Sequence, residues 1–305
     1  MSNNNTRNSA RRFGVGKTNA FDVFNIIFFI LLAFIMLYPF WSVLMSSLVT
    51  AYEHRTRAFI FWPRNPTLDS YRFIFITDRF TRSFFVTVFV TIMSTFYTLA
   101  ITTTCAYALT KKSVPGYRIF IAMLTITMFF GGGLIPYFML IRDLGLNNTL
   151  APLIVGSMSF FNFVIIRAFI TQIPDGLEES AVIDGANEVT IFFRLILPLS
   201  VPVIAVIALW TAVGAWNAFF NAMLFLTGRP DLHTLQLVLR QLVVQREGID
   251  GAEMAYRMRF GHDAAMFSHG IQMAAVVVVT TPILLVYPFL QKYFVKGIYL
   301  GAMKG

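Results

Sequence analysis

The stretch Ile173–Pro202, IPDGLEESAVIDGANEVTIFFRLILPLSVP, is a polar interval between two long apolar segments. It holds five of the fifteen acidic residues of the chain, namely Asp175, Glu178, Glu179, Asp184 and Glu188. Pro174 ends the preceding helix, and Asp175 with Glu178 has the spacing of a capping box, which predicts a new helix start. Gly185 permits a sharp bend of the backbone. The stretch therefore predicts a short helix, a bend and a second short helix over residues 188–196, all outside the bilayer.

The composition is that of an integral membrane protein. Hydrophobic residues make up 57% of the 305 residues and charged residues only 13%, whereas soluble domains are about 25% charged. The net charge of +9 is spread over the loops between apolar segments, which favours contact with membrane lipid over nucleic acid. The single cysteine, Cys105, excludes a disulfide framework and a thiolate metal site. No metal site is expected, because His233, His262 and His269 lack ligand spacing and are interpreted as solvated or capping residues.

Six apolar segments approach or exceed the roughly 20 residues that a transmembrane helix needs. They cover residues 21–48, 84–109, 119–141, 150–170, 199–226 and 271–294. The sequence therefore predicts an all-α integral membrane protein with six transmembrane helices and both termini on one side. Its parts are a tail over 1–20, a first helix, an outer segment over 49–83, a permease core over 84–295 with an outer loop over 227–268, and a tail over 296–305.

The two outer segments have some predicted structure. In the first, Thr67 is placed to cap a short amphipathic helix that runs through Tyr71 and Phe75. The second, over residues 227–268, is long for a structureless loop and is expected to be functional or bound to a partner.

The positive-inside rule does not orient the chain by number alone, because each side carries twelve of the 24 basic residues. The residue types differ, since all six lysines lie on the side of the termini and the outer segments carry only arginine. Twelve outer arginines would attract either an acidic oligosaccharide or an acidic face of a partner, or would pair with anionic lipid.

The stretch described first resembles the cytoplasmic EAA loop of ABC importer permeases. The family pattern is E-A-A, three residues, G, nine residues, I-x-L-P. Here it is Glu179-Ser180-Ala181, three residues, Gly185, nine residues, and Leu195-Ile196-Leu197-Pro198. Serine replaces the first alanine and leucine replaces isoleucine. An ordinary capped loop between two helices is the alternative.

The resemblance extends over residues 61–305. The supporting stretches are Phe61–Tyr71, Met128–Tyr137 (MFFGGGLIPY), Gly214–Leu226 (GAWNAFFNAMLFL) and Gly297–Gly305 (GIYLGAMKG). They are similar to the second permease subunit of maltose-type carbohydrate importers, in particular to the Gram-positive subgroup for polysaccharide and pectin-oligosaccharide uptake.

The resemblance implies a type I importer permease in the cytoplasmic membrane with cytoplasmic termini. It implies a homologous second permease subunit, two ATPase subunits that bind ATP and Mg, an extracellular solute-binding protein and an oligosaccharide substrate. The chain itself would be neither an enzyme nor a cofactor-binding protein. The loop over 173–198 would dock on one ATPase through Glu178, Glu179, Ser180, Ala181, Asp184, Gly185, Leu195, Leu197 and Pro198. The terminal residues Gly301, Ala302, Met303, Lys304 and Gly305 would either enter the ATPase interface or form a frayed end.

Polar and aromatic residues of the apolar segments are candidates for the substrate pathway. Asn217 and Asn221 are four apart and are expected to share a helix face beside Trp210 and Trp216, where they would either contact sugar or bond neighbouring helices. Gly131, Gly132 and Gly133 would either unwind the third segment or permit close helix packing.

Three competing functions have less support in the sequence than an importer permease. Gly14 to Thr18 looks like the end of a phosphate-binding loop, but Arg11 stands where that motif needs glycine. A membrane-embedded enzyme would need catalytic acids at depth, and within the six segments the only acid is Asp22 at an edge. An ion-coupled secondary carrier or channel for a small polar solute remains the alternative, although such carriers usually have buried acids.

Overall fold

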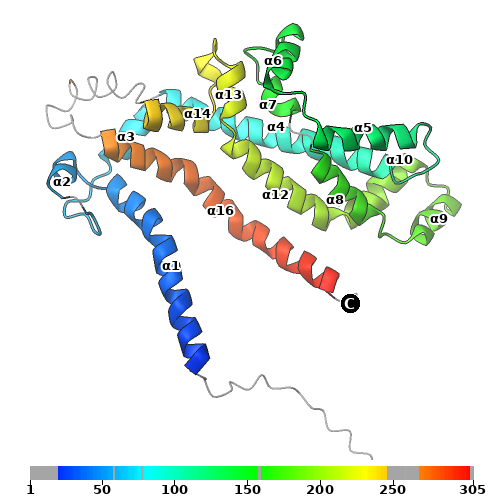
Figure 1. The fold of residues 1–305 in the computed structure, drawn as a ribbon, viewed down its shortest axis with the longest axis horizontal. Coiled ribbons are helices and arrows are strands. Elements are labelled where there is room, and N and C mark those ends of the chain that lie inside the picture. Colours follow the sequence, from blue (N-terminus) through cyan, green and yellow to red (C-terminus); the bar gives the residue numbers. More distant parts are fainter. Residues whose placement is uncertain are drawn as a thin grey trace, which may run out of the picture.

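The computed structural model describes residues 20–57, 59–76, 78–156, 159–245, 258 and 268–302, and all regular elements in this part are helices (Figure 1). The N-terminal tail over 1–19, His262 and the terminal Met303, Lys304 and Gly305 lie outside the described residues. In chain order the elements are α1 (Ala20–Ser47), α2 (Ala51–Thr56), α3 (Asp69–Ile76), α4 (Asp78–Ala108), α5 (Tyr117–Phe129), α6 (Leu134–Asp143), α7 (Ala151–Val155), α8 (Phe160–Ile170), α9 (Asp175–Ile183), α10 (Glu188–Ile191), the π-helical turn η1 (Phe192–Ile196), α11 (Leu197–Leu199), α12 (Val201–Asn217), α13 (Phe220–Phe225), the 3₁₀ turn η2 (Pro230–Leu232), α14 (Leu235–Arg240), the π-helical turn η3 (Gln241–Gln245) and α16 (Ser268–Ala302).

Three described helices are long and apolar enough to cross a membrane: α1, α4 and the part of α16 over His269–Val286. A fourth candidate is the pair Glu188–Leu199 and Val201–Asn217, which is bent by 77°. The remaining expected segments are therefore not single straight helices. The last helix also extends further than expected, because α16 includes Gly301 and Ala302 of the predicted tail.

Breaks divide three of the six predicted segments. The third divides into α5 and α6, because residues 130–133 are not helical and Gly133 has a φ of +84°. The fourth divides into α7 and α8 after Gly156, where a Cβ atom would lie 2.7 Å from the hydroxyl oxygen of Tyr137. The fifth divides into α12 and α13, because Ala218 adopts an extended backbone.

The core forms where α4 packs against α12 and α8. The buried face of α4 is a row of small hydroxyl residues, which let helix backbones approach closely. These are Ser83, Thr87, Ser94, Thr98 and Thr102. The Thr87 hydroxyl donates to the Ser83 carbonyl at 2.8 Å and accepts from the Leu235 N–H at 2.7 Å. This bond secures α14 to α4.

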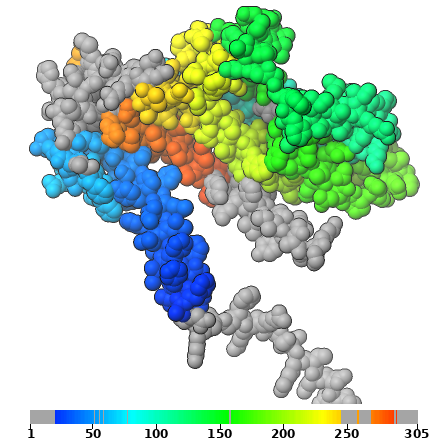
Figure 2. Space-filling view, viewed as in Figure 1, coloured from blue at the N-terminus to red at the C-terminus, as the bar shows by residue number. Residues whose placement is uncertain are grey.

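The polar elements gather at the two ends of the bundle. Figure 1 shows α2, α3 and α14 near one end of α4, and α9 and α10 near the other. α1 contacts α16 and also forms an arm that projects from the bundle, as Figure 2 shows. The apolar side chains of α1 are largely exposed. At one end, the Asp69 N–H donates to the Thr67 hydroxyl at 3.2 Å. This confirms the predicted cap of the short helix α3.

Candidate functional site: the helix–bend–helix between α8 and α12

The first short helix of this site is α9, which begins at Asp175. Pro174 occupies the N-cap position and no side chain caps the helix start. The predicted capping box is therefore wrong, because the carboxylate of Glu178 forms an ion pair with the Lys111 ammonium instead. The Ser180 hydroxyl donates to the Gly176 carbonyl at 2.7 Å, a hydrogen bond within α9.

Gly185 makes the bend that the sequence predicts. Its φ is +83°, a left-handed conformation that side chains with a Cβ rarely adopt. The Ala186 N–H donates to the Ala181 carbonyl and the Gly185 N–H donates to the Val182 carbonyl, both at 2.9 Å. These two bonds form a Schellman motif, which ends α9 and satisfies its last carbonyl groups.

The second short helix, α10, has a side-chain cap. The Asn187 side-chain oxygen accepts a hydrogen bond from the Thr190 N–H at 2.8 Å. The chain continues through the π-helical turn η1 and α11 before it enters α12. The expected second helix over 188–196 is thus confirmed, with its second half wound as a π-helix.

Apolar side chains project from both short helices. Ile183, at the end of α9, is 85% exposed, and Val189 on α10 is 64% exposed. Three more apolar residues are exposed around the bend: Leu177, Val182 and Phe193. These five exposed residues are here called the bend patch, and a bilayer does not cover them if the loop lies outside it. Exposed apolar patches of this kind mark contact sites for other proteins.

Apart from Glu178, which is partly buried and pairs with Lys111, the predicted coupling residues divide into two groups. Glu179, Ser180, Asp184, Gly185 and Pro198 are exposed. Ala181, Leu195 and Leu197 are partly buried against the core cluster that surrounds Ile196. The second group therefore positions the site, while the first group shares the outer surface with the bend patch.

Two residues that the sequence did not single out bind α9 and α10 to the end of α4. Both come from the end of α4 and the turn after it. The Tyr107 hydroxyl donates to a carboxylate oxygen of Glu188 at 2.6 Å. The Lys111 ammonium, which pairs with Glu178, lies 5.3 Å from the centre of the Tyr107 ring. Only the basic character of the loop after α4 indicated such a contact.

The pathway candidates occupy different environments. Trp216 is 7% exposed, and its indole N–H donates to the Val279 carbonyl of α16 at 3.1 Å, so it packs helices together. Trp210 is 44% exposed and stacks on Phe161 with ring centres 5.9 Å apart. A Cβ atom added to Gly131 or Gly132 would meet no described atom of this chain within 4 Å, so these glycines do not pack closely against another helix of the same chain.

The expectation that Asn217 and Asn221 share a helix face is wrong. The helix breaks between them, because α12 ends at Asn217 and α13 begins at Phe220. The Asn217 side chain donates to the Val213 carbonyl at 2.8 Å and accepts from Gln236 at 3.0 Å. The bond to Val213 lies within α12, and the bond from Gln236 links α12 to α14.

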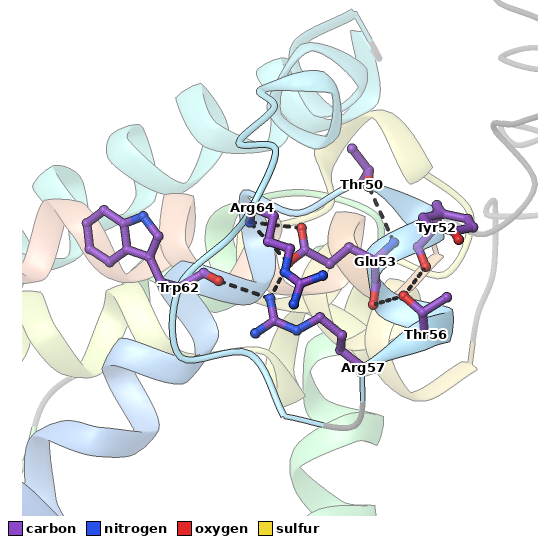
Figure 3. A network of polar contacts seen from close by, with 7 residues as sticks. All are labelled: Thr50, Tyr52, Glu53, Thr56, Arg57, Trp62 and Arg64. Carbon is purple, nitrogen blue, oxygen red and sulfur yellow. Dashed lines mark hydrogen bonds and ion pairs between the residues drawn. The ribbon is translucent and has the colours of Figure 1, made fainter.

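A second polar site lies in the outer segment, around Glu53 (Figure 3). Glu53 is 5% exposed, and its carboxylate accepts the Arg64 backbone N–H at 3.0 and 3.1 Å and the Arg57 guanidinium at 2.5 Å. Burial by itself raises the pKa of this carboxyl, but the hydrogen bonds from Arg64 and Arg57 together lower the pKa by more, and the net shift is downward. The charged carboxylate thus fastens residues 57–64 onto α2.

Of the histidines interpreted as solvated or capping residues, His269 is exposed and His233 contacts the end of a helix. His233 is buried, and its Nε2 lies 3.2 Å from the Leu226 carbonyl oxygen at the end of α13. His54 on α2 meets His269 at the start of α16 with ring centres 5.0 Å apart. Burial and the nearby His269 lower the pKa of His54.

Comparisons with known proteins agree with this architecture. No family model matches the chain. It is 40% identical over 288 residues to Protein LplC of Bacillus subtilis, covering 93% of this chain and 95% of the relative. It is 39% identical over 290 residues to the polygalacturonan/rhamnogalacturonan transport system permease protein YtcP of Bacillus subtilis, covering 95% of this chain and 100% of the relative.

A solved structure shares the fold over nearly the whole chain. It is a bacterial ABC transporter involved in the import of the acidic polysaccharide alginate, with a TM-score of 0.83, 28% identity, and coverage of 93% of this chain and 99% of that chain. The relatives are transport subunits and not enzymes, and such subunits bind no cofactor themselves. The chain belongs to the family of carbohydrate ABC transporter permeases and is a multi-pass membrane subunit of an ABC importer.

Proposed function

We propose that α9 and α10 are the coupling surface of this importer and dock on a separate ATPase subunit that binds ATP and Mg. The bend patch carries this proposal, because it presents apolar side chains on a loop that also holds five carboxylates. Apolar contacts at the centre with charged groups at the rim are the usual composition of a protein interface. Glu179 and Asp184 would then lie at the rim, and the Gly185 bend would set the angle between the two helices.

The rest of the arrangement follows from the family resemblance. We propose six membrane crossings, of which the third, fourth and fifth are interrupted helices, with both termini and the coupling loop in the cytoplasm. Interrupted helices are tolerated at membrane depth where they lie against protein or a water-filled path. A homologous permease subunit would cover the opened segment at Gly131–Gly133. A solute-binding protein would dock on the outer segments, and the residues after Gly301 would reach toward the ATPase.

Co-purification tests the coupling surface. The tagged chain is solubilised from its native membrane in mild detergent, and the proteins that accompany it are identified by mass. A second permease and two copies of an ATPase are expected. Glu179→Arg and Ile183→Asp should reduce the ATPase, because one reverses a rim charge and the other places a charge inside an apolar interface.

Glu188→Gln is not a suitable control, because Glu188 bonds Tyr107. Thr171→Asp is a matched control, since Thr171 is exposed and lies before α9. A chain that purifies alone, or whose ATPase content is unchanged in Glu179→Arg and Ile183→Asp, would contradict the proposed coupling surface.

We also propose an acidic oligosaccharide as the substrate. The names of one relative and one solved structure point to polygalacturonan, rhamnogalacturonan and alginate. Arg79 on α4 and Arg240 on α14 support this substrate class. Neither pairs with a carboxylate among the described residues, and the Nε atom of each is buried without a hydrogen-bond partner there. Gln241 accepts from Arg79 at 2.5 Å, and Arg240 lies 4.6 Å from the centre of the Phe219 ring at the break after α12.

Uptake of oligosaccharides of equal length tests the substrate class. Oligogalacturonate uptake should be competed by alginate oligosaccharide and not by a neutral oligosaccharide. Arg240→Gln should weaken the apparent affinity for the acidic substrate by roughly tenfold, because a charge-assisted hydrogen bond is worth about 1.5–3 kcal/mol. Arg142→Gln is the control, since Arg142 is exposed and pairs with Asp143. Equal uptake of neutral sugar would contradict the proposal.

A further inference from the structure

The end of α4 is bonded to both sides of the Gly185 bend. Lys111, just beyond α4, pairs with Glu178 on α9, and Tyr107 donates to Glu188, the first residue of α10. These partners are 67 and 81 residues apart in the sequence. In the sequence, α9 and α10 follow α8 and precede α12, whereas α4 lies much earlier in the chain. The two contacts therefore join the helix–bend–helix to a membrane helix that is not its neighbour in the chain.

The Lys111–Glu178 pair and the Tyr107 ring are partly shielded from solvent, whereas Glu188 is exposed. The Glu178 side chain is 19% exposed and the Lys111 side chain 32% exposed. Tyr107 is 7% exposed, and its ring lies 5.4 Å from the Phe192 ring of η1. An ion pair in such a setting is screened less by salt than an exposed pair. The Lys111–Glu178 pair thus differs from the exposed pairs of the chain, such as Arg142 with Asp143, which contribute little to the stability of the fold.

Around these contacts, the end of α4 packs together with α8 and α12. Ala106, Tyr107 and Leu109 of the α4 end share a buried cluster with Phe163 and Ile166 of α8. The same cluster includes Ile191, Phe192 and Ile196 after the bend, and Val203 and Ile207 of α12.

α8 is also bonded to the end of α4. The Arg167 Nε donates to the Leu109 carbonyl at 2.9 Å, which satisfies an orphan carbonyl at that end. A displacement of α9 and α10 would therefore have to move α4 as well, or break these bonds.

We propose that Lys111 and Tyr107 are positioning residues that transmit movement of the coupling helices to α4. The proposal rests on the proposed docking of an ATPase at the bend patch. Movement between two states is transmitted when packed elements move as rigid bodies with discrete contacts. The Lys111–Glu178 pair carries the movement from α9, and the Tyr107–Glu188 bond carries it from α10. Through α4, a helix of 31 residues, the movement reaches α14 and the outer end, where Thr87 bonds Leu235.

A charge reversal in the complete transporter tests this proposal. The complex of both permeases and both ATPases is reconstituted in liposomes with the loaded binding protein, and ATP hydrolysis and sugar uptake are measured together. Lys111→Glu should leave the ATPase bound but lower the sugar moved per ATP by roughly fivefold or more, the lower end of typical coupling between sites. The exchanged pair Lys111→Glu with Glu178→Lys should restore most of this ratio.

Lys112→Glu is the matched control, because the neighbouring Lys112 is exposed, and it should leave the ratio unchanged. Tyr107→Phe should lower the ratio by removing the bond to Glu188 while it preserves the ring that packs on Phe192. A ratio that stays at the wild-type value in Lys111→Glu, or a double variant no better than the single one, would overturn the proposal. Absence of any ATPase from the wild-type complex would instead overturn the coupling surface itself.

Discussion

The Glu53 carboxylate is a single buried charge that organises an outer segment. It accepts two backbone contacts from Arg64 and one from the Arg57 guanidinium. Glu53→Gln keeps the size of the side chain but removes its charge. It should destabilise the packing of residues 57–64 on α2 by about 1–3 kcal/mol, the cost of leaving a buried polar group without its partner. Limited proteolysis of the outer segment measures this change.

The same residue predicts a pH dependence. The pKa of Glu53 is below its ordinary value, so the folded segment favours the charged form. Its contribution to stability is present above the ordinary carboxyl pKa and is lost as the pH falls through the lowered one. Protease sensitivity should rise on acidification in the wild-type chain and be already high, with little further change, in Glu53→Gln. Asp69→Asn, at an exposed pair with Arg72, is the control, and equal pH profiles in all three chains would contradict the prediction.

At the scale of elements, the angle between α9 and α10 depends on one backbone conformation. Gly185→Ala should cost about 1–2 kcal/mol, because a left-handed φ brings a Cβ too close to the following carbonyl. Gly176→Ala is a matched control inside α9, where alanine is favoured over glycine by roughly 0.5–1 kcal/mol and no atom is within 4 Å of the new Cβ. Thermal stability of the purified complex and its bound ATPase measure both effects. Equal behaviour of the two variants would show that the bend is not required.

The contact of α2 with α16 should weaken in acid. Burial and His269 lower the pKa of His54 below its ordinary 6.5, so the neutral ring is favoured in the fold. Glu53 acts in the opposite direction as a nearby negative charge. Stability from this contact is therefore present above pH 6.5 and declines as the pH falls below that value. The protection of residues 50–57 from hydrogen exchange, corrected for the intrinsic pH dependence of exchange, should fall from about pH 7.5 to 5.5, the range in which histidine titrates, and less so in His269→Gln.

At the scale of the whole molecule, the proposed six crossings place the two ends of the bundle on opposite sides of the membrane. The chain has one cysteine, so Cys105→Ala provides a background for single-cysteine labelling. Cysteines at exposed Ser113 and Thr171 should react with a membrane-impermeant maleimide only after permeabilisation, whereas those at exposed Asn65 and Thr227 should react in intact cells. Labelling of Ser113 and Thr227 on the same side would contradict the proposed number of crossings.

Local chemistry explains which predictions from the sequence hold. Glycine with a positive φ, proline at a helix start and an apolar run each act within a few residues, so the bend at Gly185, the cap of α3 and the long helices α1, α4 and α16 could be predicted. The spacing from Glu179 to Pro198 is likewise local, and it identified the family. The sequence by itself thus determined the class of the protein, its membrane character and the position of the helix–bend–helix that we propose as the coupling surface.

Only the tertiary structure decided which distant groups meet. Glu178 had two possible partners, the start of its own helix and a cation elsewhere, and packing of α9 beside the end of α4 selected Lys111. The break after Asn217 and the burial of Trp216 likewise depend on how α12 packs against α14 and α16. Contacts over 60 or more residues carry no local pattern, because they are set by the summed packing of whole helices.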